Sequence, residues 1–236
     1  MGLVSNFLNK TGASVLAVSA GLVFMPMTAH ALTIGIKDLF SGDELIISDN
    51  DGTDESAAAG IVSIAGQTIG QSFLSFEIAE FQDAAGQSFL TMSTSAEAGS
   101  EGMYIDVFHE GFGGGANSPS QSIVTFTANS SSISGSLFAE GFVDDGNVGA
   151  LFDDDPGDSV GNGTIASNTD DVDASASFVL GDPFAMTIFT TLDPGTKIVN
   201  YDATVTATPI PLPAAGFLLL GGLGGLVALR RKRKAA

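Results

Sequence analysis

The chain has 236 residues and a formal net charge of −19, with 27 acidic residues, 8 basic residues and no cysteine. Every acidic residue lies between Asp38 and Asp202, and the segment 32–208 holds only two lysines, Lys37 and Lys197, and no arginine. Such a surface repels nucleic acid and anionic membranes, so we expect no nucleic-acid partner. The lack of cysteine excludes a disulfide framework and thiolate metal sites.

The first 31 residues have the layout of a secretory signal peptide. An uncharged apolar run over residues 13–24 is followed by a short stretch of small and polar residues that ends in an A-x-A triplet at Ala29 and Ala31. This triplet is typical of a signal peptidase site, so we expect cleavage after Ala31. The alternative is a membrane anchor that is kept, for which the apolar run is short and interrupted by Pro26.

Residues 32–207 contain many short stretches in which residues alternate in character, separated by Gly, Asn, Asp and Ser. A period of two is typical of strands with one buried face. We expect an all-β fold, a jelly-roll-like antiparallel β-sandwich, that forms one acidic ectodomain over 32–207 with phenylalanine as its main large core residue. Besides a brief strand over 44–48, the pattern predicts inward-facing side chains at Leu32, Ile34, Ile36, Leu74, Phe76, Ile78, Met103, Ile105, Val107, Val124, Phe126, Phe184, Met186, Ile188, Val199, Tyr201, Ala203, Val205 and Ala207.

One short sequence occurs twice within this ectodomain. The five residues GQSFL at 70–74 recur at 86–90. Two equivalent strands of one hairpin would explain the pair, and chance is the alternative. A single pair is too little to indicate a repeat architecture.

The candidate metal site is a group of three aspartates, Asp49, Asp51 and Asp54, around Gly52. Ca²⁺ prefers oxygen ligands of this kind, but the spacing fails the EF-hand pattern, which needs acids at its first and twelfth positions. The alternative is a set of solvated turns, because Asp, Asn and Gly favour turns. Ca²⁺ is the only cofactor that the sequence suggests, and further acidic loops are expected at 144–147, 153–158 and 170–173.

The sequence offers little catalytic chemistry. Ser159 is the centre of a G-x-S-x-G stretch, and His109 is the only histidine that follows the predicted cleavage site. The flanking residues do not provide the strand and helix that this hydrolase motif joins, and we expect His109 to be an exposed residue at a strand end. We therefore expect a protein without enzymatic activity, with a secreted hydrolase as the weaker alternative.

The chain ends in a three-part membrane signal over residues 208–236. The 16 residues 214–229 carry no charge and would form a helix about 24 Å long, a little short of the hydrocarbon core of a membrane. The cations that follow would hold this end on the cytoplasmic side, so we expect a temporary anchor in the inner membrane. The proline motif consists of Ile210, Pro211, Leu212, Pro213 and Ala214, and the basic stop consists of Arg230, Arg231, Lys232, Arg233 and Lys234 within the tail 230–236.

This tail resembles the VPLPA-type PEP-CTERM sorting signals, with Ile210 where the family usually has valine. The resemblance implies that an exosortase, a membrane cysteine protease of Gram-negative bacteria, processes the chain and releases it to the cell surface or extracellular matrix. The LPxTG signal of sortases is a rival interpretation, but Ala215 replaces the threonine that supplies the acyl group there.

These features predict an exported cell-surface or matrix protein with a structural, adhesive or binding role. Extracellular polysaccharide is the partner that the resemblance implies. The alternative function is a calcium-stabilised carbohydrate-binding module. Such modules usually present exposed aromatic rings, whereas this chain has no tryptophan and its two tyrosines, Tyr104 and Tyr201, are interpreted as strand residues.

Overall fold

The structure, a computed structural model, describes residues 32–210 apart from four short internal segments. These segments are 83–86, 114–119, 147–150 and 153–156. The predicted signal peptide with Ala29 and Ala31 lies outside the described residues, as does the tail from Pro211 onward with the rest of the proline motif, the apolar span 214–229 and the basic stop. Within the described part of the chain, no helix is long and apolar enough to cross a membrane.

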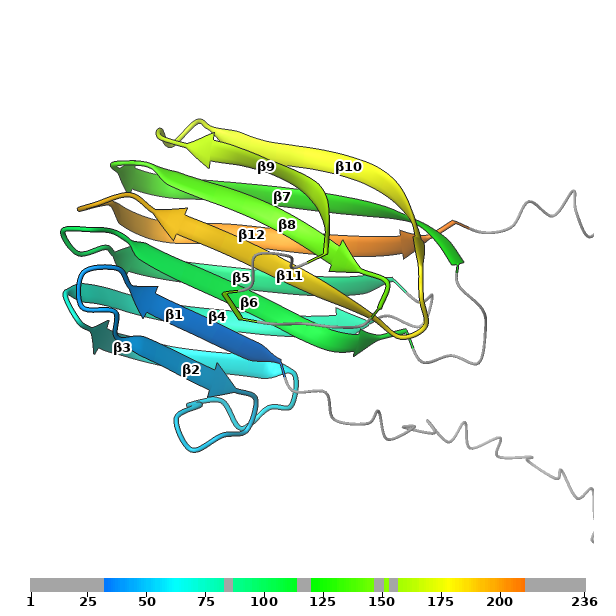
Figure 1. The fold of residues 1–236 in the computed structure, drawn as a ribbon, viewed down its shortest axis with the longest axis horizontal. Coiled ribbons are helices and arrows are strands. Elements are labelled where there is room, and N and C mark those ends of the chain that lie inside the picture. Colours follow the sequence, from blue (N-terminus) through cyan, green and yellow to red (C-terminus); the bar gives the residue numbers. More distant parts are fainter. Residues whose placement is uncertain (1–31, 83–86, 114–119, 147–150, 153–156, 211–236) are drawn as a thin grey trace, which may run out of the picture.

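The described chain forms two six-stranded antiparallel sheets packed face to face (Figure 1). The first sheet has the order β2-β1-β6-β11-β8-β9 and comprises β1 (Thr33–Asp38), β2 (Glu44–Ser48), β6 (Met103–Phe112), β8 (Leu137–Asp144), β9 (Asp158–Ile165) and β11 (Phe184–Leu192). The second sheet has the order β10-β7-β12-β5-β4-β3 and comprises β3 (Ile61–Ile69), β4 (Ser72–Gln82), β5 (Ser88–Glu97), β7 (Ser120–Ser134), β10 (Asp171–Leu180) and β12 (Lys197–Pro209). The predicted all-β antiparallel sandwich is confirmed, with more strands than the eight of a simple jelly roll.

The core between the sheets is mainly aliphatic, which corrects the expected phenylalanine core. The predicted inward-facing residues of β1, β4, β6, β7 and β11 are all buried. Isoleucine, leucine, valine and methionine fill most of these positions. Among the phenylalanines whose side chains the structure describes, the buried ones are only Phe76, Phe112, Phe126 and Phe184.

The prediction for the last strand was wrong at one residue. From Tyr201 onward the expected residues are buried, but Val199 is 49% exposed and Ile198 is buried in its place. The register of β12 against β5 shifts between Ile198 and Tyr201, and Asn200 has a φ of 49°. An extra residue of this kind reverses which side chains face the core on one side of the bulge.

The repeated GQSFL sequence lies in one hairpin, as one of its two explanations requires. The two copies open β4 and β5, which pair with each other antiparallel. In both copies the serine (Ser72 and Ser88) and the leucine (Leu74 and Leu90) are buried. The intervening Phe73 points outward and is 47% exposed. Residue 86 lies outside the described residues.

The acidic loop expected at 170–173 is mostly a strand. Asp171 and Asp173 lie in β10 with exposed side chains, on either side of the buried Val172. Only Asp170 belongs to the preceding turn, where its carboxylate accepts a hydrogen bond from the amide of Ala166 at 2.9 Å. The alternation of β10 therefore places two acids on the outer face of the sandwich instead of in a loop.

A buried carboxylate joins loops of both sheets at one end of the sandwich. Asp38 Oδ1 accepts hydrogen bonds from the amide and hydroxyl of Ser41, and Oδ2 accepts from the amide of Gln71 at 3.1 Å and from Ser72 Oγ at 2.7 Å. The amide of Gly99 in turn donates to Ser72 Oγ. Burial alone would raise the pKa of Asp38, but the hydrogen bonds from Ser41, Ser72 and Gln71 lower it to about 2.

Two glycines let the sheets approach closely where β9 crosses to β10. A Cβ atom on Gly161 would lie 2.1 Å from the Cβ of Ala174, and one on Gly163 would lie 2.8 Å from a methyl carbon of Val172. No side chain fits at such distances. The β9–β10 edge of the sandwich therefore depends on the absence of side chains at these two positions.

Replacing Asp38 should destabilise the fold in a way that depends on pH. Asp38→Asn turns one acceptor oxygen into a donor that faces other donors, and we expect a loss of about 3 kcal/mol, or about 6–12 °C in Tm. Because the pKa of Asp38 is lowered from 3.8 to about 2, its stabilisation is complete above pH 3.8 and is lost as the pH falls through 2. Thermal melts of wild type and variant between pH 7 and pH 2 should therefore converge at the acid end.

The matched control for this experiment is Asp43→Asn in the same loop, where the side chain is exposed. We expect this variant to melt within about 2 °C of wild type. An Asp38→Asn variant that melts no lower than Asp43→Asn at pH 7 would contradict the structural role of Asp38.

A swap of two small residues should test the close contact between β9 and β10. Gly161→Ala should cost about 1–3 kcal/mol, because its new methyl group meets Ala174. Adding Ala174→Gly should recover most of that loss, because the double variant only moves one methyl group from residue 174 to residue 161. Urea unfolding of the two single variants and the double variant measures the coupling between residues 161 and 174. If the two single changes in the free energy of unfolding simply add up in the double variant, the contact does not form. Gly52→Ala, where no atom lies near the new methyl group, is the neutral control.

Candidate functional site

The outer face of the first sheet carries five aromatic side chains on three adjacent strands. Tyr104 and Phe108 come from β6, Phe189 comes from β11, and Phe138 and Phe142 come from β8. Each of them alternates with buried residues of its strand and remains partly exposed. We call this group the aromatic face.

The strand register arranges the aromatic face as a regular grid. Neighbouring strands lie about 4.8 Å apart and every second residue advances about 6.7 Å, so the grid measures about 10 Å by 13 Å between its corner Cα atoms. The rings of Tyr104 and Phe189 have centroids 5.5 Å apart and are tilted by 48°. Across β6, β11 and β8, the three rows of the grid are Phe108-Thr187-Phe142, Asp106-Phe189-Glu140 and Tyr104-Thr191-Phe138. Four rings thus occupy the corners and one the centre, with polar residues between them.

The sequence of β8 explains why its rings face outward. Leu137, Ala139 and Val143 fill the inward positions and are buried. The fourth inward residue is Gly141, at which a Cβ atom would lie 2.5 Å from the ring of Phe126 in the opposite sheet. The intervening phenylalanines are therefore held on the outside by close packing on the inside.

Glu140 forms the polar centre of the β8–β9 side of the grid. Its Oε1 accepts hydrogen bonds from Ser159 Oγ at 2.7 Å and from Asn162 Nδ2 at 3.1 Å, both from the neighbouring strand β9. Two donors on one carboxylate oxygen fix the orientation of the Glu140 side chain. The Glu140 side chain as a whole is partly exposed to solvent.

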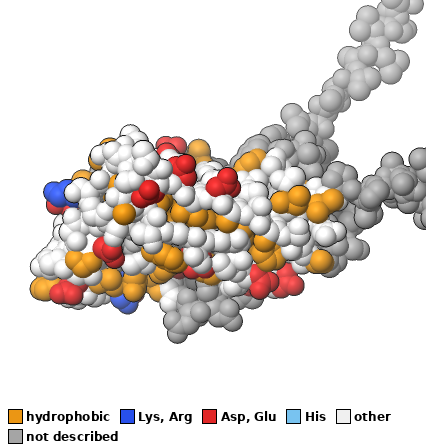
Figure 2. All heavy atoms as spheres, turned by 90° about the horizontal axis from the view of Figure 1, so that it is seen from above, with side chains coloured by type: hydrophobic (Ala, Val, Ile, Leu, Met, Phe, Trp, Pro, Cys, Tyr) orange, Lys and Arg blue, Asp and Glu red, His pale blue; other side chains and the backbone are white. Residues whose placement is uncertain are grey.

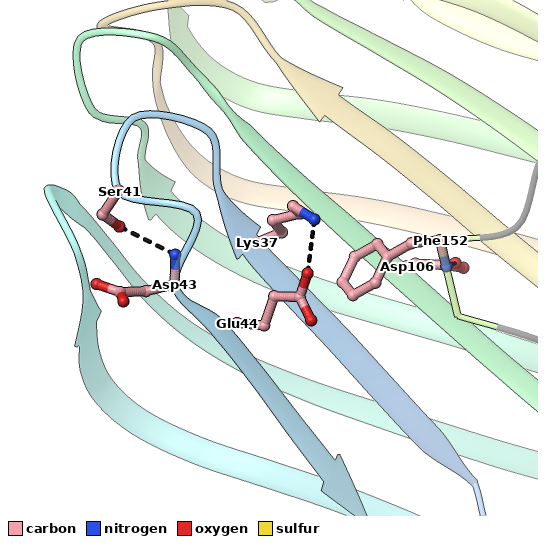
Figure 3. A network of polar contacts seen from close by, with 6 residues as sticks. All are labelled: Lys37, Ser41, Asp43, Glu44, Asp106 and Phe152. Atoms are coloured by element: carbon pink, nitrogen blue, oxygen red, sulfur yellow. Dashed lines mark hydrogen bonds and ion pairs between the residues drawn. The ribbon is translucent and has the colours of Figure 1, made fainter.

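At the opposite side of the grid, Phe152 from the β8–β9 connection lies against β1 and β6. Its amide donates a hydrogen bond of 2.7 Å to Asp106 Oδ2. Its ring lies 5.8 Å from Lys37 Nζ, which forms an ion pair of 2.6 Å with Glu44 (Figure 3). A Cβ atom on Gly35 would lie 2.8 Å from the Phe152 ring, so glycine at this position leaves room for it. Asp106 is consequently only 2% exposed although it faces outward.

Charge on this molecule is predominantly negative. Between residues 32 and 210, the only basic side chains are Lys37 and Lys197, and each forms an ion pair with a glutamate, Glu44 and Glu97 respectively. In the view of Figure 2, acidic side chains are scattered over the surface, whereas basic ones lie only toward one end. A ligand that approaches the aromatic face therefore meets a negative electrostatic potential.

Ser159 and His109 do not form the serine–histidine pair that a hydrolase would need. Ser159 is exposed in β9, on the outer face of the first sheet. His109 was expected to be exposed, but it is 2% exposed and points into the sandwich, because it falls in the inward phase of β6. Its Nε2 lies 3.4 Å from Glu80 Oε2. Burial and then the charge of Asp49 raise the pKa of Glu80.

The three aspartates of the predicted calcium site accept hydrogen bonds from backbone amides of their own loop and its surroundings. Asp51 accepts from Thr53 and from the amide of Ser48 at 2.9 Å, and these bonds lower its pKa to about 2. Asp54 accepts from the amides of Asn50, Ser56 and Ser63, and Asp49 accepts from Gly60. Among the described residues, no group of three His, Cys, Asp or Glu side chains is arranged to hold a metal. Calcium binding by Asp49, Asp51 and Asp54 stays a prediction.

The sequence interpretation missed the aromatic face. It predicted Met103, Ile105 and Val107 to face inward, which leaves Tyr104 and Phe108 on the outer face, yet it assigned phenylalanine to the core. The signal that was available is the phase of the alternation. In both β6 and β8, the aromatic residues occupy the positions that the buried aliphatic residues leave free.

No known family model and no curated protein sequence matches this chain. Among solved structures, the enzymatically active domain of tailspike protein 4 of bacteriophage CBA120 is similar over 57% of this chain and 19% of its own, with 11% identity and a TM-score of 0.27. The C-terminal CBM6 of the laminarinase LamC from Zobellia galactanivorans is similar over 54% of this chain and 86% of its own, with 11% identity and a TM-score of 0.25. The mannan-recognising carbohydrate-binding module TmCBM27 is similar over 61% of this chain and 88% of its own, with 10% identity and a TM-score of 0.26. TM-scores this low establish no relationship, so the aromatic face has to be interpreted from its own geometry.

Proposed function

We propose that this protein is an exported, nonenzymatic polysaccharide-binding protein of the cell surface or extracellular matrix. The observation that carries the proposal is the aromatic face, a grid of five partly exposed rings with the partly exposed Thr191 and Glu140 between them. A monomeric protein rarely exposes so many aromatic rings together unless they bind something.

Sugars fit this pattern of groups better than a purely apolar ligand does. A pyranose ring has an apolar C–H face, which stacks on an aromatic ring, and a rim of hydroxyl groups, which needs hydrogen-bond partners. The grid supplies rings at its corners and centre, and the partly exposed Glu140 and Thr191 between them. A binding site made of aromatic rings and a few oriented polar groups is the usual form for small polar ligands.

Export and sorting complete the proposal. Signal peptidase would cut after Ala31, and an exosortase would process the tail that begins with the proline motif. The position of the motif suits this role, because the Ile210 amide still donates to the Gln121 carbonyl at the end of β12, so processing beyond it spares every described strand. The polysaccharide matrix would then be the place where the aromatic face acts.

Removing a corner ring of the aromatic face should weaken polysaccharide binding. We expect Phe138→Ala and Phe142→Ala each to raise the Kd by about tenfold, because each removes one stacking surface. Affinity electrophoresis through gels that contain soluble polysaccharides would find the ligand, and calorimetry with oligosaccharides would measure the Kd.

The matched control is Phe73→Ala, since Phe73 is exposed on the outer face of the second sheet. This variant should bind like wild type. Equal weakening by Phe73→Ala, or no binding of any polysaccharide by wild type, would contradict the proposed function.

The sorting proposal predicts the mass of the mature protein. The form isolated from the cell surface or culture medium of the native bacterium should lack residues 1–31 and the basic stop from Arg230 to Lys234. Intact-mass spectrometry would measure both ends, and a surface form that still carries the basic stop would rule out exosortase processing. The same strain without its exosortase is the control and should retain the full tail.

A further inference from the structure

A carboxylate lies within the aromatic face and indicates which polysaccharides it selects. Resting on the proposed function, we infer that Glu140 binds the ammonium group of an amino sugar, so that the aromatic face prefers cationic glycans such as those that contain glucosamine. Glu140 stands in the middle row of the grid, between Phe138 and Phe142 on its own strand and opposite Phe189 on β11.

The three rings around Glu140 suit a cation. Phe138 and Phe142 are two residues away along β8, a spacing of about 6.7 Å, and Phe189 is directly across on the neighbouring strand. A cation held at the carboxylate would therefore have three rings nearby, and the face of an aromatic ring attracts an ammonium group within about 6 Å of the ring centre. The same rings stack on the sugar that carries the ammonium group.

The Glu140 carboxylate is oriented but has no basic partner in the described chain. Its Oε1 is held by Ser159 and Asn162, both neutral donors. The two lysines of the described residues pair with Glu44 and Glu97. No cationic side chain of the described residues therefore occupies this partly exposed carboxylate, and a cationic ligand can form a charge-assisted hydrogen bond with it.

The charge around the aromatic face also disfavours anionic glycans. Asp106 belongs to the same row as Glu140, and Lys37, the cation beside Phe152, is already ion-paired with Glu44 (Figure 3). Uronic acids and sulfated sugars would bring a second negative charge to this surface. Neutral sugars would stack on the rings without forming the ion pair.

The test compares four hexasaccharides by calorimetry, below the pKa of the sugar amine and at low salt. The four probes are hexaglucosamine, its fully N-acetylated form, cellohexaose and a hexauronate. Wild type should bind hexaglucosamine about tenfold more tightly than the two neutral hexasaccharides, with the hexauronate weakest, and added salt should reduce the preference.

Glu140→Gln should remove this preference while binding of the neutral hexasaccharides is kept. Glutamine can still accept the hydrogen bonds from Ser159 and Asn162, so a thermal melt should show a folded variant. Glu140→Asp keeps the charge and should keep part of the preference. Glu77→Gln, on the exposed outer face of the second sheet, is the matched control and should bind like wild type.

The possible failures can be told apart. If wild type binds none of these hexasaccharides or any other glycan, the proposed function itself is wrong. If wild type binds glycans but shows no preference for hexaglucosamine, or if Glu140→Gln keeps the preference, only the role of Glu140 is wrong. If a lysine-rich peptide binds as tightly as hexaglucosamine and competes with it, the ligand is a basic protein segment and the amino-sugar inference is overturned.

Discussion

One buried carboxylate fixes how the two sheets align at one end of the sandwich. Asp38 ends β1 of the first sheet and accepts hydrogen bonds from Gln71 and Ser72 of the second. Strand β1 pairs along its length with β6, which carries two of the five rings of the aromatic face. The position of that face relative to the rest of the molecule therefore depends on a hydrogen-bonded charge that lies inside the fold.

The same strands build the core and the aromatic face from two different kinds of apolar residue. On β6 and β8, aliphatic side chains occupy the inward phase and aromatic ones the outward phase. Aliphatic side chains interdigitate closely with the opposite sheet, as the contact between Gly141 and Phe126 shows.

Alternation in the sequence was enough to predict the sandwich, because a period of two marks one buried face whatever the sheet order. It was not enough where the backbone departs from that period. The bulge at Asn200 reversed the facing of Val199, and a bulge depends on pairing with a distant strand. It also could not separate core from surface in strands that are apolar on both faces. His109 was expected to be exposed because it was placed at a strand end, whereas β6 runs on to Phe112 and His109 continues the buried phase of Val107.

The connection between β8 and β9 is longer than their pairing requires. The two strands are neighbours, and two residues can join neighbouring antiparallel strands, yet β8 ends at Asp144 and β9 begins only at Asp158. Phe152, within this connection, reaches across the sheet to Asp106 and Gly35. Connections tolerate changes in length and sequence better than strands do. In related chains, changes in this one segment would therefore alter what lies against Asp106 and Gly35 while every strand pairing is inherited unchanged.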